Sequence, residues 1–189
     1  EELGRLIQPL TKRPYNPPMP SQIIIENIYS IALEHNALND PVARRVPVYL
    51  PAGYSPESKY PVIYLLAAFG SRGLKFLNDD IWEENIQQRL DRLIASDAMR
   101  PTIVVMPDAS TRYGGSQYLN SDALGDYEDA MLELVRVIDR KYATLPAPGA
   151  RARAVFGPIP GARPQISAAN LCRADRAGCD GDDAWQRDQ

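Results

Sequence analysis

Two glycines that stand four residues apart carry the clearest chemical signal in this chain of 189 residues. Gly157 and Gly161 have the spacing of the motif G-x-S-x-G, in which a serine on a sharp strand-to-helix turn attacks a carbonyl carbon. The central position holds Ile159, between Pro158 and Pro160, and isoleucine has no nucleophilic atom. The spacing therefore predicts the approach to an acyl-transfer site whose nucleophile is missing.

The groups that would assist such a serine are missing as well. The N–H of the residue after the nucleophile normally helps to hold the oxyanion, and Pro160 has no N–H. A histidine has to follow the serine as general base, but the single histidine, His35, lies far upstream. We expect His35 to be a surface or structural residue, and we expect no catalytic triad.

The apolar pattern places this glycine frame directly after the last of five predicted strands. Two helical patterns interrupt the strands, so the expected order is strand, strand, strand, helix, strand, helix, strand. Such alternation predicts an α/β fold with a mainly parallel sheet, an antiparallel start and helices on both faces. Function in these sheets gathers at the carboxyl ends of the strands. The predicted strands lie at about 22–35, 44–50, 60–69, 102–108 and 153–156.

Three of these elements carry predictions about which residues face the core. The first strand is expected to present one apolar side, made of Ile23, Ile25, Tyr29, Ile31 and Leu33. The first helix is expected to begin near Asp80, with Glu83 at the spacing of a capping box and with an apolar stripe of Trp82, Ile86, Leu90, Leu93 and Ile94. The second helix is expected to begin near Asp126, with a stripe of Tyr127, Met131, Leu134, Val135, Ile138 and Tyr142.

Five stretches between about residues 20 and 157 resemble, in the same order, the "putative esterase" branch of the α/β-hydrolases. That branch includes S-formylglutathione hydrolases, enterochelin-type, feruloyl and acetyl esterases, and mycolyltransferases. The resemblance implies the N-terminal half of an α/β-hydrolase sheet, incomplete after the elbow. It also implies hydrolysis of a small-molecule carboxylic ester or thioester with no cofactor. The matching stretches are VPVYLPAGY, YPVIYLLAAFGSRG, ENIQQRLDRLIAS, TIVVMPDASTRYGGSQYLNS and DYEDAMLELVRVIDRKYAT.

The resemblance further implies where the site residues stand. In relatives the loop after the third strand carries His-Gly or a similar pair, and the N–H of the next residue is one oxyanion donor. Ala67 and Ala68 occupy those places here, which makes Phe69 the oxyanion-hole candidate. For Ser116, the serine of YGGSQY, a structural role within its loop is the alternative to contact with the substrate. The loop expected to border the substrate cleft carries Tyr113, Ser116 and Gln117.

Other residues with reactive or ligating atoms have simpler interpretations. Ser71, in FGSRG, comes close to the nucleophile motif but follows the wrong strand. Asp108 is expected to cap a turn, and the acidic run at 78–80 is expected to cap the first helix. No metal site is expected, because residues 180–183 lack the calcium-loop pattern. The two cysteines, Cys172 and Cys179, are expected to be free thiols, since one histidine and no second cysteine pair make a zinc set improbable.

Charge and composition exclude two classes of partner. A net charge of -3 opposes nucleic-acid binding, which needs a basic surface. No apolar run approaches the roughly 20 residues that span a bilayer, so no membrane partner is expected. The N-terminus shows no secretory signal pattern, so the compartment stays open, with the cytoplasm favoured.

Residues 158–189 differ in composition from what precedes them. Of the 33 residues from Gly157 on, 22 are Ala, Arg, Asp, Gly or Pro, and neither a helical stripe nor a strand alternation is present. All five types have G/C-rich codons, which is the outcome of a shifted reading frame in a G/C-rich gene. We therefore expect three regions: a Pro-rich arm (1–21), a partial esterase domain (22–157) and an aberrant, disordered tail (158–189).

The resulting hypothesis is a serine-esterase relative that is inactive as it stands. The alternatives are a non-catalytic member that binds a ligand through its cleft, and an acyltransferase of the mycolyl type. Self-association is also expected, because an incomplete sheet would leave its last apolar strand with unpaired backbone groups.

Overall fold

The computed structural model describes residues 19–145 and 151–156, the latter as backbone. The glycine frame, the tail after it and nearly all of the N-terminal arm lie outside these residues. The strands are β1 (Gln22–Tyr29), β2 (Ala43–Leu50), β3 (Val62–Leu66), β4 (Ile103–Val105), β5 (Asn120–Ser121), β6 (Gly125–Asp126) and β7 (Arg151–Phe156). The helices are the 3₁₀ turn η2 (Gly73–Leu77), α1 (Ile86–Ala95) and α2 (Tyr127–Lys141).

The five longer strands form one mixed sheet in the order β1-β2-β4-β3-β7, and β5 pairs with β6 in a separate small ribbon. β3 pairs in parallel with both β4 and β7, whereas β2 pairs antiparallel with β1 and β4. Only β2 is reversed, but its place between two strands of the other direction makes two of the four pairings antiparallel. The expected order of elements is confirmed, and the expected mainly parallel sheet is not.

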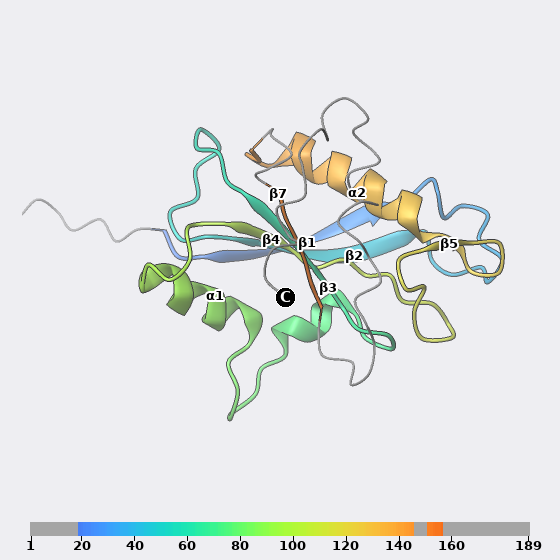
Figure 1. Ribbon diagram of the computed structural model, residues 1–189, viewed down its shortest axis with the longest axis horizontal. Helices are drawn as coiled ribbons and strands as arrows, with labels where there is room; N and C mark the ends of the chain where they lie inside the picture. Colours follow the sequence, from blue (N-terminus) through green and yellow to red (C-terminus); the bar gives the residue numbers. More distant parts are fainter. Residues whose placement is uncertain (1–18, 146–150, 157–189) are drawn as a thin grey trace, which may run out of the picture.

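Successive residues of the central strands supply two cores on opposite faces of the sheet. Val48 and Val105 pack in the core beneath α2, while their neighbours Tyr49 and Val104 pack in the core beneath α1. All four side chains are at most 2% exposed. This alternation is expected of strands that are covered on both sides, and Figure 1 shows α1 and α2 on either side of the sheet.

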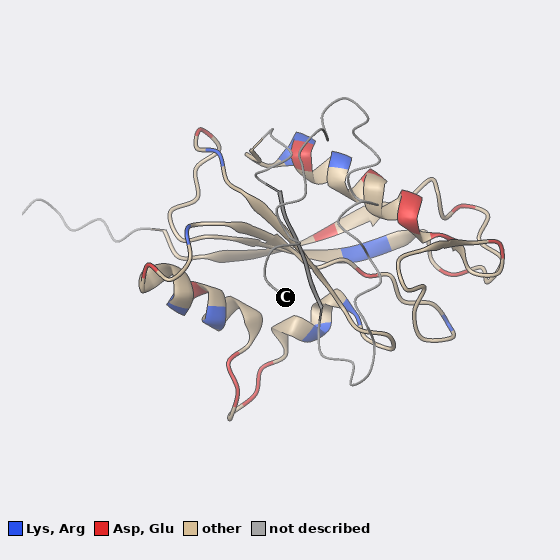
Figure 2. Ribbon diagram, in the orientation of Figure 1, with Lys and Arg blue, Asp and Glu red and all other residues tan. Residues whose placement is uncertain are grey.

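The second predicted helix is confirmed. α2 begins one residue after Asp126, and every residue of the predicted stripe is buried. Its free N-terminal amides are capped from a distance, because the Asn120 side chain accepts hydrogen bonds from the N–H groups of Glu128 (2.9 Å) and Asp129 (3.2 Å). Acidic residues in its first turn and basic residues in its last turn complement the helix dipole (Figure 2).

The predicted start of the first helix is wrong by six residues. α1 begins at Ile86 because Asn85 and Gln88 form a complete capping box: the Asn85 side chain accepts from the Gln88 N–H, and the Gln88 side chain accepts from the Asn85 N–H, both at 3.0 Å. Asp80 instead closes a local turn by accepting from the Trp82 N–H at 2.8 Å. Trp82, expected in the apolar stripe, is 87% exposed.

The predicted face of the first strand is wrong at Tyr29 and Ile31, whereas Leu33 is buried as predicted, in the turns that follow the strand. β1 ends at Tyr29 because α2 holds the next turn: the Glu133 carboxylate accepts from the Ser30 hydroxyl at 2.6 Å and from the Ala32 N–H at 3.1 Å. Tyr29, the last residue of the strand, is 58% exposed, and Ile31 in the turn after it is 69% exposed. The side that packs under α2 carries Ile24 and Ile28.

The two candidate caps of α1 can be separated by mutation. Asn85→Ala should lower the free energy of unfolding by about 1 kcal/mol, since it removes a capping-box side chain. Asp80→Ala should cost less than about 0.5 kcal/mol, because its turn is exposed and outside the helix. Urea denaturation of the two variants measures the difference, and equal losses would contradict the assigned helix start.

Candidate active site

The candidate site lies at the edge of the sheet where the parallel strands end. The carboxyl ends of β3 and β4 lead into the loops 67–72 and 106–118. The last residue of β7, Phe156, is the register partner of Leu66, the last residue of β3. β7 thus ends at the edge where the loop of Phe69 begins, and the glycine frame that follows it in the sequence lies outside the described residues.

The oxyanion candidate is an exposed residue, and its N–H has no hydrogen-bond partner among the described residues. Phe69 is 57% exposed. The Ser71 N–H donates to the Ala68 carbonyl at 2.9 Å, which closes a tight turn around Phe69 and Gly70. Only Gly70 in this turn has a positive φ, +75°, so Ala68 occupies its place without backbone strain.

A tyrosine from the second loop fixes the first loop. The Tyr118 hydroxyl donates to the Ala67 carbonyl at 3.0 Å. Burial raises the pKa of this phenol above its ordinary value. The phenol is therefore protonated at neutral pH and available as a donor.

The ring of Phe69 rests on two glycines of the second loop. A Cβ added to Gly114 would lie 2.7 Å from Cε1 of Phe69, and one added to Gly115 would lie 3.3 Å from its Cδ2. Gly114 also has a φ of +118°, which side chains rarely tolerate. The two glycines let the loops approach more closely than any larger residue would.

The three predicted cleft residues differ in what they can offer a ligand. Ser116 is 3% exposed, and its hydroxyl is used within its own loop. The hydroxyl donates to the Ala109 carbonyl at 3.1 Å and accepts from the Tyr118 N–H at 3.2 Å. Tyr113 is 71% exposed. Gln117 is exposed and has a φ of +56°, a left-handed conformation that is uncommon outside glycine.

The remaining candidate residues, Asp108 and His35, take no part in a reactive arrangement of side chains among the described residues. Asp108 accepts from the Ser110 N–H at 3.0 Å, which confirms the predicted turn cap. His35 is exposed in the turns after β1. Within the described part of the chain no group of three or more His, Cys, Asp or Glu side chains could hold a metal ion, and no helix is long and apolar enough to cross a membrane.

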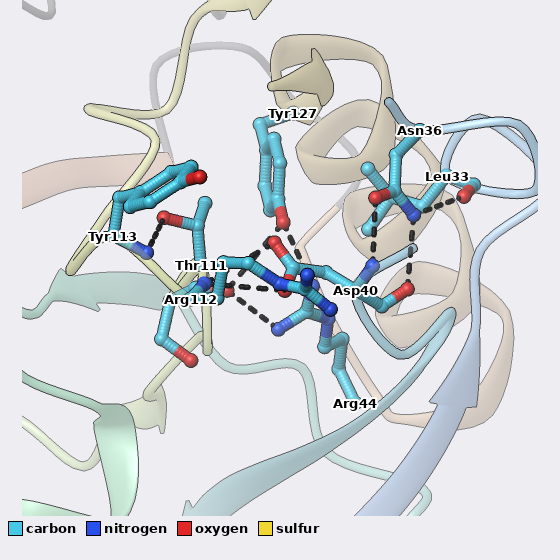
Figure 3. Close-up of polar contacts among 9 residues, drawn as sticks. Leu33, Asn36, Asp40, Arg44, Thr111, Arg112, Tyr113 and Tyr127 are labelled. Atoms are coloured by element: carbon cyan, nitrogen blue, oxygen red, sulfur yellow. Dashed lines mark hydrogen bonds and ion pairs between the residues drawn. The ribbon is translucent and has the colours of Figure 1, made fainter. Parts of the chain in front are cut away.

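Sequence reasoning missed a buried polar cluster beneath the second loop (Figure 3). Arg44 of β2 donates to the Ser110 carbonyl and to the Tyr127 hydroxyl, and Asp40 accepts from the N–H of Arg112. These residues come from segments 66 to 83 positions apart. No local spacing signals such a cluster, so only an arginine inside an otherwise apolar strand could have drawn attention to it.

A cavity formed by described residues lies elsewhere. It holds about 650 Å³ and opens between the start of β1, the end of β2 and the end of α2, with Lys59, Arg140 and Lys141 on its wall. This is the edge where β3 and β4 begin. Ligands of open α/β sheets bind at the opposite edge, which is where the two loops described above meet.

Comparison with known proteins decides the family. A family model described as "Putative esterase" matches residues 36–158. The chain belongs to this esterase family.

Individual relatives agree with that assignment. Endo-1,4-beta-xylanase Y of Acetivibrio thermocellus is 33% identical over 97 residues, which are 51% of this chain and 8% of that enzyme. A solved ferulic acid esterase is 25% identical with a TM-score of 0.56, covering 71% of this chain and 50% of that one. The feruloyl esterase module of Clostridium thermocellum, complexed with sinapinate, is 23% identical with a TM-score of 0.53, covering 73% and 44%.

The chain spans about half the length of these solved esterases. The predicted resemblance to the esterase branch of the α/β-hydrolases is confirmed by the family match and by the ferulic acid esterase. Because the xylanase match covers so little of that enzyme, its name says nothing about this segment.

The contact between Phe69 and Gly114 yields a thermodynamic prediction. Gly114→Ala should cost at least about 1 kcal/mol more stability than Gly53→Ala, because Gly53 also has a positive φ (+71°) but open space around it. In a Phe69→Ala background, the cost of Gly114→Ala should fall by about 1 kcal/mol or more as the clash disappears. Denaturant melts of the four variants test this, and strict additivity would show that the two residues do not touch.

Proposed function

We propose that this esterase-family chain forms the part of a serine carboxylic-ester or thioester hydrolase that holds the oxyanion loop and one wall of the substrate cleft. In the family chemistry a serine attacks the ester carbonyl, a histidine takes the serine proton, and backbone N–H groups hold the developing oxyanion. The substrate would be a small-molecule ester, and the chemistry needs no cofactor. Phe69 supplies one oxyanion N–H, and Tyr113 and Gln117 border the cleft.

One observation carries this proposal. The register between Leu66 and Phe156 sets the end of β7 beside the start of the loop that carries Phe69. In G-x-S-x-G enzymes the nucleophile follows such a strand directly, and the oxyanion donors come from that turn and from the loop after the neighbouring strand. The Phe69 N–H, which has no partner among the described residues, and the position of Gly157 in the sequence match this arrangement.

We further propose that the chain does not complete this reaction. Ile159 at the nucleophile position has no reactive atom, and Pro160 has no N–H to offer the oxyanion. Residues 161–189 contain no histidine. The composition of residues 158–189 supports loss of the reading frame just before the serine codon. The family match and the two solved structures named above are esterases, so neither the non-catalytic ligand-binding alternative nor the acyltransferase alternative is favoured.

The central prediction is catalytic silence. The purified chain should hydrolyse p-nitrophenyl acetate no faster than its heat-denatured form, and a fluorophosphonate probe should add no mass to it. Ile159→Ser should not rescue turnover, because the base and the second oxyanion donor would still be absent. Intact-mass spectrometry after probe treatment measures this directly.

A positive result would be traced with two matched variants. Ser71→Ala and Ser116→Ala each remove one serine, from the loop 67–72 and from the loop 106–118. Stoichiometric labelling that either substitution abolishes would overturn the proposal and identify a different nucleophile.

A further inference from the structure

We infer that Asp40 and Arg44 are positioning residues, which fix the direction of the Phe69 backbone N–H through their contacts with the loop 106–118. This inference rests on the proposed function, since it concerns the N–H assigned there to the oxyanion hole. Neither residue reaches the site itself. They act through the backbone of residues 110–112 and then through the loop contacts of Phe69.

The first link is a fork from Arg44 to the second loop. Its side chain is buried, with Nη1 donating to the Ser110 carbonyl at 2.7 Å and Nη2 to the Tyr127 hydroxyl at 2.8 Å. The guanidinium carbon also lies 5.5 Å from the centre of the Tyr127 ring. A planar, always charged guanidinium with donors in fixed directions sets the position of Ser110 more firmly than a lysine could.

The second link is the Asp40 carboxylate, whose side chain is only 6% exposed. It accepts from the Arg112 N–H at 3.1 Å. Its own place is fixed by Asn36, whose amide accepts from the Asp40 N–H at 2.8 Å and donates to the Asp40 carbonyl at 2.9 Å (Figure 3). The Arg112 side chain is 58% exposed and 4.0 Å away, so that ion pair contributes little. The backbone bond is the effective contact.

The third link joins this anchored backbone to the oxyanion loop. Two residues past Arg112, Gly114 carries the ring of Phe69. Further on, Tyr118 holds the carbonyl of Ala67, two residues before the Phe69 N–H. The first loop is therefore held at both the ring of Phe69 and the carbonyl of Ala67, by a segment that Asp40 and Arg44 hold in turn.

Backbone strain in the same loop supports a positioning role. Gln117 and Tyr118 have φ values of +56° and +59°, a left-handed conformation that is unfavourable for residues other than glycine. Strain of this kind persists only where surrounding contacts enforce it, and it concentrates at functional sites. Here the strained pair aims the Tyr118 hydroxyl at Ala67.

The chain offers a simple spectroscopic test, because it contains three phenylalanines: Phe69, Phe76 and Phe156. A sample labelled with ¹⁵N-phenylalanine gives three backbone amide signals, and Phe69→Leu identifies that of Phe69. In the unmodified chain the Phe69 amide should be ordered, with an order parameter near 0.85. Arg44→Met and Asp40→Ala should displace its signal and lower its order parameter below about 0.6, leaving Phe76 unchanged.

Conservative and distant variants complete the design. Asp40→Asn keeps an acceptor for the Arg112 N–H and should restore the Phe69 signal. Tyr29→Phe and Arg92→Gln remove exposed hydrogen bonds to Glu34 and Glu84 and should change nothing at Phe69. If Arg44→Met does not fold, the Phe69 amide signal is measured in Tyr127→Phe and Arg44→Lys instead, and the same displacement is expected. A Phe69 amide that stays ordered in every folded variant would overturn the inference. Because the readout needs no ester chemistry, fluorophosphonate labelling could refute the proposed function while these spectra still confirm the positioning.

Discussion

The parallel pairing of β3 with β4 on one side and with β7 on the other is the constraint on which the site depends. Parallel strands end at the same edge, so three chain segments far apart in sequence leave the sheet there together. Val62, Ile103 and Val105 are at most 2% exposed, so the pairing of β3 with β4 lies inside the core. A one-residue slip of β7 would break the register that sets Phe156 beside Leu66.

Anchoring the second loop has an energetic cost, because it buries two charged side chains. Arg44 and Asp40 are nearly buried, and Arg44 Nε has no partner among the described residues. Taking such charges out of water is unfavourable, and apolar replacements of similar volume are often neutral or stabilising. A fold selected only for stability has little reason to keep these two charges. Their bonds to backbone groups of a single loop suggest that geometry at the sheet edge is what they secure.

The sequence allowed the framework to be predicted more fully than the site. The stripe of α2 was predictable because six apolar residues repeat at helical spacing, and their burial depends mainly on that spacing. The start of α1 was not, because Asp80 and Asn85 offer the same capping spacing and only tertiary packing selects between them. The cluster of Asp40, Arg44 and Tyr127 depends on contacts between distant segments, and so does the register that brings Phe156 beside Leu66. Local patterns contain no information on either.

We propose that the carboxyl edge of this sheet is built for a serine elbow that the reading frame no longer encodes. Translating the gene in its two other frames from about codon 156 tests that claim most directly. The account predicts that one frame continues as an esterase, with a serine two residues after the first elbow glycine, a helix, then an acidic residue after a strand and a histidine in a late loop. Early stop codons in both frames, with no serine at the elbow, would contradict it.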